Sequence, residues 1–275
     1  MAKRKPPRRT AATSDRYKLY ELAVQSPKAD CLFIDQVWLE MRGREARTLR
    51  EDFCGTSLLA IEWVRRHGRN TAIGVDIDPA VLAVARQRVL KRLKPMQRHR
   101  LRLIAGDVTK VETPRVDTVV APNFSYWIFK TRARMRAYFR AVRRALVDDG
   151  IFILDAYGGH GAYQPQRERR QEDGFTYVWD QAHYNPVTGD VVNHIHFEFP
   201  DGTRMKKAFT YEWRLWSLPE LRELLREAGF KEVIVYWEGT DEERNEGNGI
   251  FTPTVVGEAC PGWVSYLVAV RSLAH

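Results

Sequence analysis

The chain has few cysteines and no long apolar run. Its 275 residues include three cysteines, Cys31, Cys54 and Cys260. These are too few and too scattered for a disulfide framework or a zinc site, so they favour free thiols in a reducing compartment, which we expect to be the cytoplasm. No stretch approaches the roughly 20 apolar residues that cross a bilayer. The sequence therefore predicts a soluble protein without a membrane partner. It does not indicate an oligomeric state.

The formal net charge is +9, and the start of the chain contains no acidic residue. Residues 1–14 carry five lysines and arginines and no acid, which predicts a disordered basic tail outside the fold. Two further basic runs, 86–102 and 132–144, alternate with apolar residues at helical spacing. We interpret them as solvated helix faces in preference to a binding patch, and a nucleic acid is kept as the alternative partner.

Short apolar runs alternate with amphipathic helical patterns, which is typical of parallel strands joined by crossover helices. The core is expected at 47–160 and again at 217–275, where a capping box at Ser217 starts the last helix. The sequence predicts an α/β fold with a doubly wound, seven-stranded, mainly parallel sheet. The first expected strand runs from Arg47 into the charged residues at 50–52. The others are expected over 71–77, 101–105, 116–121, 151–157, 232–237 and 263–270.

Between 161 and 216 the pattern changes to a period of two. The runs 175–184, 191–199 and 204–216 alternate, and turn residues join them, so the sequence predicts an inserted antiparallel β meander of three strands. Its aromatic residues either cap an acceptor pocket or pack the meander. His194 and His196 share one face without a third ligand at recognisable spacing. We interpret them as exposed or cross-strand-paired histidines, and no metal site is predicted.

Glycine is scarce where a dinucleotide site would need it. The stretch TLREDFCGTSLLA, residues 48–60, is a strand ending in charged residues, a turn with one glycine, and the start of a helix. A second strand ends at Asp76, 25 residues after Glu51. Acids at neighbouring strand ends beside a glycine turn are typical of a nucleotide site. Without G-x-G-x-x-G, however, a pyrophosphate-binding dinucleotide site is disfavoured.

These motifs resemble the class I S-adenosylmethionine-dependent methyltransferases, whose first motif is an acid, two residues, and C-G-T-G. Here EDFCGTS matches, with Phe53 and Ser57 in place of glycines. The motifs GVDIDP, AGDV, APNFSYW and LVDDGIFILD follow in the family's order, and the resemblance covers about 45–160 and 215–270. It implies a Rossmann-like methyltransferase fold, S-adenosylmethionine as cofactor, S-adenosylhomocysteine as product, and methyl transfer by in-line displacement.

The resemblance also implies roles for single residues. Glu51 would hold the amino group of the cofactor's methionine end, Gly55 would allow close backbone approach, and Asp76 would accept the ribose hydroxyls. Asp107 with Val108 would read the adenine edge. Further cofactor contacts are predicted from Tyr17, Tyr20, Arg50, Cys54, Thr56, Ile77, Asn123 and Phe124.

Three of these assignments have alternatives. Asp52 replaces Glu51 if the register differs by one residue. Arg50 either faces the cofactor carboxylate as a bidentate partner or pairs with an acid elsewhere. Tyr17 and Tyr20, within a helical segment at 15–46, either cover the methionine end or pack that helix on the core.

Methyl transfer requires the acceptor to be aligned with the methyl group, and it requires a proton acceptor where the methylated atom carries a proton. The candidate catalytic residues follow the fourth and fifth strands: Asn123, Tyr126, Tyr157 and His160, with Ser125 beside them. Tyr126 is alternatively a core aromatic and His160 a loop histidine. The glycine- and glutamate-rich loop at 240–249 is a lid or simply mobile.

The sequence favours a methyltransferase for a small molecule. One alternative is an RNA methyltransferase, motivated by the basic charge. The other is a non-catalytic S-adenosylmethionine-binding regulatory module, motivated by Phe53 and Ser57, whose side chains would crowd the cofactor.

Overall fold

The computed structural model describes residues 9–241 and 246–273, and it divides into two compact units. The core unit comprises 26–160 and 216 onward, and the insertion unit comprises the residues up to Gln25 together with 161–215. The predicted N-terminal segment at 15–46 is therefore split between them, with α1 (Arg16–Ala23) in the insertion unit and α2 (Pro27–Arg42) in the core unit.

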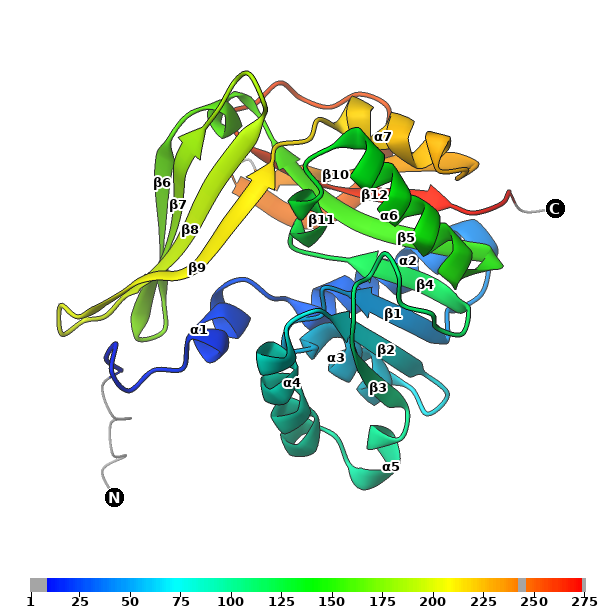
Figure 1. Cartoon of the computed structure of the whole chain (residues 1–275), viewed down its shortest axis with the longest axis horizontal. Coiled ribbons are helices and arrows are strands. Elements are labelled where there is room, and N and C mark those ends of the chain that lie inside the picture. Colours follow the sequence, from blue (N-terminus) through cyan, green and yellow to red (C-terminus); the bar gives the residue numbers. More distant parts are fainter. Residues whose placement is uncertain (1–8, 242–245, 274–275) are drawn as a thin grey trace. The chain divides into compact units, whose positions relative to one another are not determined.

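The core unit is built on one eight-stranded sheet in the order β11-β10-β12-β5-β4-β1-β2-β3 (Figure 1). β1 to β5 are mutually parallel, whereas β12, β10 and β11 join by antiparallel pairing. The strands are β1 (Thr48–Asp52), β2 (Thr71–Asp76), β3 (Leu101–Ala105), β4 (Val116–Ala121), β5 (Leu146–Gly158), β10 (Glu232–Asp241), β11 (Glu246–Thr254) and β12 (Trp263–Val270).

The doubly wound, mainly parallel sheet is confirmed, but the prediction of seven strands is wrong by one. The eighth strand, β11, pairs antiparallel with β10 along the edge of the sheet. Most of the residues predicted as a lid or mobile loop at 240–249 therefore belong to these two strands, while 242–245 lie outside the described residues. Because β11 reads EGNGIFTPT, with four polar or acidic residues, two glycines and a proline, it has no alternating pattern that predicts a strand.

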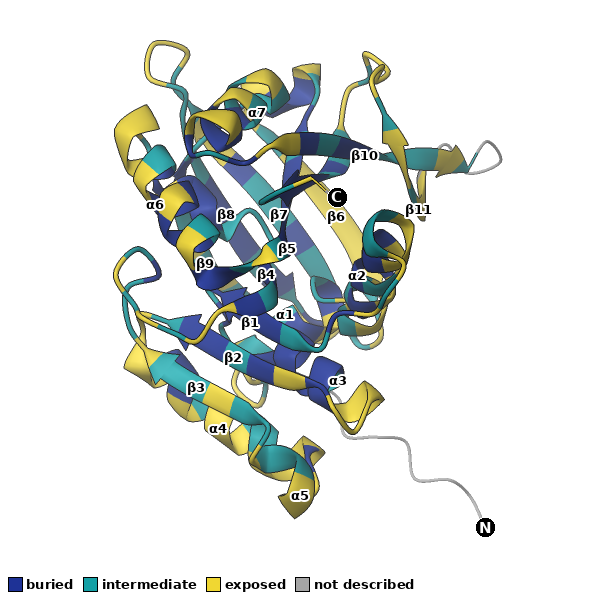
Figure 2. Ribbon diagram, turned by 90° about the vertical axis from the view of Figure 1, so that its right-hand side faces the viewer, coloured by how far each residue is buried: buried dark blue, intermediate teal, exposed yellow. Residues whose placement is uncertain are grey.

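Helices cover both faces of this sheet. α2 packs against α3 (Leu58–Arg66), and α6 (Arg132–Ala145) packs against α7 (Leu218–Glu227). Figure 2 shows the two pairs on opposite sides of buried strands. The predicted stripe of α6 is buried, from Met135 to Ala145, and the Ser217 capping box forms with Glu220. The remaining helices are α4 (Pro79–Arg92), α5 (Pro95–Arg98), η1 (Ser125–Ile128) and η2 (His160–Tyr163).

The insertion unit is an antiparallel sheet in the order β6-β7-β8-β9, confirming the inserted β structure but with four strands where three were predicted. Leu19 and Ala23 of α1 pack with Phe175, Ile195 and Phe197 in its core. The added strand has the exposed sequence QRERRQE, which has no apolar alternation to predict it. The strands are β6 (Gln166–Glu172), β7 (Phe175–Tyr184), β8 (Asp190–Glu198) and β9 (Arg204–Arg214).

Part of the predicted basic tail is ordered in the insertion unit. Residues 1–8 lie outside the described residues. A turn closes between Thr10 and Thr13, and the Ala11 N–H donates to Thr203 Oγ1 at 3.0 Å. Residues 9–14 therefore belong to the fold of this unit.

The two histidines of β8 are paired across strands, which confirms that interpretation. His194 Nδ1 lies 3.0 Å from Thr210 Oγ1 on β9, and His196 Nε2 lies 3.1 Å from Asp180 Oδ2 on β7. Over the described residues, no cluster of histidine, cysteine and acidic side chains has the geometry of a metal site. A search of the same residues found no helix long and apolar enough to span a membrane.

Candidate active site

The turn after β1 holds three residues in left-handed conformations. Phe53, Gly55 and Ser57 have φ angles of 56°, 53° and 59°, a region in which glycine is favoured. The Gly55 N–H donates to Asp76 Oδ2 at 2.9 Å, which ties the turn to the end of β2. A Cβ built on Gly55 would meet no atom within 4 Å. The backbone at Gly55 therefore borders open space beside the Asp76 carboxylate.

Phe53 directs its ring into an aromatic cluster. The ring centroid lies 5.6 Å from that of Tyr138 and 6.1 Å from that of Phe129. These contacts offset the strain of a left-handed φ at a bulky residue, about 1–2 kcal/mol. Ser57 is buried and leads into α3. The Phe53 ring is therefore engaged in packing, and the non-catalytic module motivated by Phe53 and Ser57 stays a prediction.

Glu51 is buried at the end of β1 and caps α3. Its Oε2 accepts the Ala60 N–H at 3.0 Å, while the Ser57 side chain makes no capping bond. Burial first, and then the nearby carboxylates of Asp30 and Asp76, raise the pKa of Glu51 to about 8, although the bond from Ala60 lowers it. A cation bound beside Glu51 would relieve this cost of burying a carboxylate.

Arg50 points to the other side of β1 and pairs with Asp52. Its Nε donates to Asp52 Oδ1 at 2.7 Å, and its Nη2 donates to the Val108 carbonyl at 3.1 Å. The Tyr138 hydroxyl donates to Asp52 Oδ2 at 3.0 Å. The structure thus has Arg50 paired with an acid of its own strand. Because the Asp52 charge is already paired with Arg50, Glu51 is the better candidate of the two acids for holding an ammonium group.

Further predicted cofactor residues lie near the ends of β1, β2 and β3. Asp76 Oδ1 accepts the Asp78 N–H at 3.0 Å, and burial raises the Asp76 pKa. Asp107 Oδ1 accepts from the Thr109 hydroxyl at 2.7 Å, and this bond lowers the Asp107 pKa. Ile77 is 72% exposed beside Asp76. Cys54, Thr56 and Val108 are buried, and the Thr56 hydroxyl has no hydrogen-bond partner within the described residues.

Asp155, which was not predicted as a site residue, organises the loop after β4. Its two carboxylate oxygens accept the N–H groups of Asn123 and Phe124 at 2.7 and 2.8 Å. Both residues have positive φ, at 60° and 58°. Burial raises the Asp155 pKa to about 7. The available signal was an acid at the carboxyl end of an apolar strand, the same signal that marked Asp76.

The predicted catalytic residues fall into different environments. Tyr126 is fully buried and its hydroxyl donates to the Asp155 carbonyl at 2.7 Å. It is a core aromatic, and we exclude it from the catalytic candidates. Tyr157 is partly exposed and stacks on Trp127 at 4.7 Å between centroids. His160 is exposed at the start of η2, and the Ser125 hydroxyl donates to the Pro122 carbonyl at 3.0 Å.

Tyr17 and Tyr20 lie in the insertion unit. Their ring centroids are 5.8 and 5.1 Å from that of Phe209 on β9. Packing is therefore one role of this helix face, and contact with a cofactor stays a prediction.

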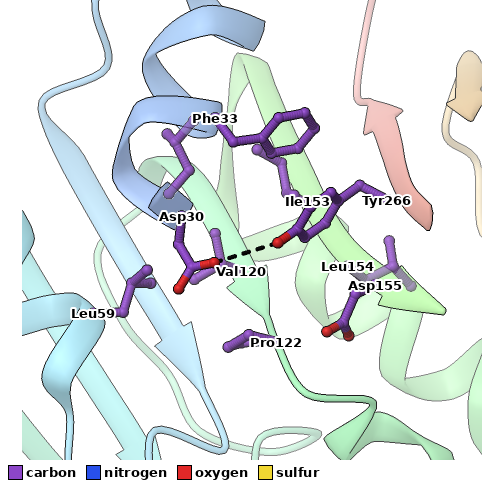
Figure 3. A pocket seen from close by; sticks show the side chains of 10 residues that line it. Asp30, Phe33, Leu59, Val120, Pro122, Ile153, Leu154, Asp155 and Tyr266 are labelled. Carbon is purple, nitrogen blue, oxygen red and sulfur yellow. Dashed lines mark hydrogen bonds between the residues drawn. The ribbon is translucent and has the colours of Figure 1, made fainter. Parts of the chain in front are cut away.

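A small pocket opens in the core unit at the carboxyl ends of β4 and β5, beside β1 (Figure 3). β1 and β4 are the neighbours at which the strand order reverses, the usual place for ligands in doubly wound sheets. Asp30 reaches the pocket from α2, Asp155 from β5 and Tyr266 from β12. The remaining lining is apolar apart from backbone: Phe33, Ile34, Leu59, Val120, Pro122, Ile153 and Leu154.

Asp30 was missed by sequence analysis. The Tyr266 hydroxyl donates to its Oδ1 at 3.3 Å, and burial raises the Asp30 pKa to about 6. As one acid on an amphipathic helix, outside any motif, it carries no local signal. Only the packing of α2 brings it to the strand ends.

Comparisons with known proteins agree with this geometry. Residues 54–152 match a family model described as a methyltransferase domain. No curated protein sequence matches the chain. Among solved structures, an S-adenosylmethionine-dependent methyltransferase from Clostridium acetobutylicum matches with a TM-score of 0.67 and 17% identity, covering 91% of this chain and 96% of that one.

Two further structures share the fold over nearly their whole length. The amino pentose methyltransferase CalS10 from Micromonospora echinaspora has a TM-score of 0.66 and 18% identity, with 94% and 98% of the two chains covered. The sugar N-methyltransferase KedS8 from Streptoalloteichus has a TM-score of 0.61 and 19% identity, with 98% of each chain covered. Residues 54–152 thus match a methyltransferase domain. The solved structures show that the chain has the fold of S-adenosylmethionine-dependent methyltransferases, as its motifs predict.

Proposed function

We propose that this enzyme transfers the methyl group of S-adenosylmethionine to a small-molecule acceptor at the carboxyl edge of the core sheet. The observation that carries the proposal is the Gly55 turn, whose N–H is bound by Asp76 and whose α-carbon borders open space. A ligand can approach the backbone there and meet the Asp76 carboxylate at once. Such an arrangement suits an adenosine ribose.

The surrounding residues fit the parts of the cofactor, which supplies a methyl group on a sulfonium. Asp76 keeps lone pairs for the ribose hydroxyls after accepting two backbone N–H groups. Glu51, buried and capping α3, suits the ammonium of the methionine end. Asp107 and the exposed Ile77 flank the position of the adenine, with one acceptor and one apolar surface.

A small acceptor is supported by the names of similar structures and by the loop that Asp155 holds. CalS10 and KedS8 are described as acting on an amino pentose and a sugar. In this chain Asn123, Tyr157 and His160 remain the acceptor-side candidates near the ends of β4 and β5. The chain contributes alignment and exclusion of water, which are the main demands of a methyl transfer. The cytoplasm is the compartment that the sequence favours.

Calorimetry with S-adenosylhomocysteine tests the cofactor assignment. Asp76→Ala should weaken binding about 10- to 100-fold, the loss of hydrogen bonds from two hydroxyls to a charged group. The matched control is Glu112→Ala, an exposed acid on the loop after Asp107, whose affinity should equal that of the wild type. Absence of binding by the wild-type chain would overturn the proposal.

A further inference from the structure

Asp30 is a buried carboxylate to which no part of the proposed cofactor is assigned. It comes from α2, whereas the proposed cofactor residues lie at or just after strand ends: Glu51, Gly55, Asp76 and Asp107. In Figure 3 its carboxylate points toward the space between α2 and the end of β4, with Tyr266 on one side. Within the described part of the chain, the Tyr266 hydroxyl is the side-chain donor to this carboxylate.

The residues that line the pocket favour a cation as its ligand. Asp30 and Asp155 are the charged residues of the described lining, and both are acids. Each Asp155 oxygen already accepts one backbone N–H, from Asn123 or Phe124, whereas Asp30 accepts one side-chain bond, from Tyr266. Asp30 therefore has the greater acceptor capacity left for a ligand. Apolar side chains strengthen its attraction for a positive charge by excluding water.

Two aromatic residues also line the pocket, with their rings packed on each other. The rings of Phe33 and Tyr266 stack with centroids 4.4 Å apart. A neutral hydroxyl acceptor would leave Asp30 without a charge partner in this apolar setting, whereas an ammonium would pair with it.

We propose that Asp30, oriented by Tyr266, binds the amine of the methyl acceptor, so that a primary or secondary amine is the substrate class and nitrogen the methylated atom. This inference rests on the proposed function. The acceptor ammonium gives one proton to the Asp30 carboxylate, which becomes a carboxylic acid. The nitrogen electron pair then forms the bond to the methyl carbon, and the sulfonium sulfur keeps the electron pair of the bond that breaks. Asp30 later releases its proton to solvent.

The position of Asp30 separates this role from that of Glu51. Glu51 stands at the end of β1 next to the Gly55 turn, where the cofactor's methionine end is proposed. Asp30 shares its pocket with the ends of β4 and β5, where the acceptor-side residues follow. Burial also gives Asp30 a pKa of about 6, close to the pH at which a proton acceptor works well.

The test uses the full chain saturated with S-adenosylhomocysteine and titrated by calorimetry with n-butylammonium chloride, and in parallel with 1-butanol. The wild type should bind butylammonium at least about tenfold more tightly than butanol, because a buried carboxylate pairs with the charge. Asp30→Asn should remove that preference, and Tyr266→Phe should weaken it by a few-fold. Asp35→Asn, a change on the same helix at an acid paired with Arg66 outside the pocket, is the matched control.

S-adenosylhomocysteine affinity is measured first for every variant. Asp30→Asn should keep it within about threefold of the wild type, which also shows that the variant folds. If the wild type fails to bind S-adenosylhomocysteine, the proposed function falls and the inference falls with it. If that affinity is normal, three results overturn the amine site alone. These are no preference for butylammonium in the wild type, an unchanged preference in Asp30→Asn, or a loss of S-adenosylhomocysteine affinity in Asp30→Asn as large as the loss of butylammonium affinity.

Discussion

Gly55 and Asp76 are joined by a 2.9 Å hydrogen bond from the backbone N–H of the first to the carboxylate of the second. One acid thus fixes the turn after β1 and presents an acceptor at the end of β2. The arrangement explains why charge and a glycine turn stand together where a core strand would otherwise continue with apolar residues. It also makes the glycine itself testable.

Gly55→Ala should reduce S-adenosylhomocysteine affinity by more than tenfold, because the new Cβ enters the open space that we assign to the cofactor. The left-handed φ of 53° also destabilises an alanine by about 1–2 kcal/mol. Gly43→Ala is a matched control, since Gly43 ends α2 with φ 62° and a similarly open Cβ position. Both variants should lose similar stability in denaturant titrations, and equal losses of ligand affinity would contradict the assignment.

Asp155→Asn should lower the free energy of unfolding by about 1–3 kcal/mol. The carboxylate accepts two N–H groups, from Asn123 and Phe124, whereas an amide offers one oxygen and turns its NH₂ toward the second donor. Urea unfolding measures the loss. Asp148→Asn, at an acid whose side chain is 84% exposed, should change stability by less than about 0.5 kcal/mol. Equal effects of the two changes would show that the Asp155 contacts do not hold the loop.

Stability should fall as the pH rises from 5 to 9. The folded-state pKa values of Asp30, Asp155 and Glu51 are raised to about 6, 7 and 8, above their ordinary values of 3.8, 3.8 and 4.5. The folded state therefore holds protons that the unfolded state releases. Their contribution is complete below pH 4 and is lost as the pH rises through the folded pKa values. Glu51→Gln, which keeps an acceptor for the Ala60 N–H, should flatten the upper part of this dependence in urea titrations. A slope identical to that of the wild type between pH 7 and 9 would be evidence against a raised Glu51 pKa.

Deletion of residues 1–8 should leave S-adenosylhomocysteine affinity and small-molecule methylation unchanged. The cut stops before Arg9 because residues 9–14 belong to the insertion unit. Binding of a labelled oligoribonucleotide by the full chain and the deletion variant, measured between 50 and 200 mM salt, tests the RNA alternative. Tight, steeply salt-dependent binding that accompanies methylation of the oligonucleotide would favour RNA over a small acceptor.

The sequence could predict the parts of the site that are local to strand ends. Glu51, Gly55, Asp76 and Asp107 follow apolar runs within a few residues, so their position at one edge of the sheet follows from parallel topology. For Arg50 the sequence allowed either the cofactor carboxylate or an acid of the chain as partner. Alternation along a strand indicates the direction of a side chain but does not identify the residue that it meets. In the structure the neighbour is Asp52, whose second oxygen accepts from Tyr138 of α6, 86 residues further along the chain.

What the sequence could not predict depends on contacts between distant segments. Asp30 gains its place through α2 packing on strands that follow it in the chain. The edge strands β6 and β11 are polar or glycine-rich and become strands through backbone pairing with β7 and β10. Edge strands need little apolar surface of their own, so hydrophobic periodicity does not detect them.

The most direct test of the account is a crystal structure of the full chain with S-adenosylhomocysteine. We predict both ribose hydroxyls within about 3.2 Å of the Asp76 carboxylate, the ligand backbone against Gly55, and the sulfur facing the pocket that Asp30 and Asp155 line. A ligand bound away from the Gly55 turn, or a ribose without contact to Asp76, would contradict the central claim.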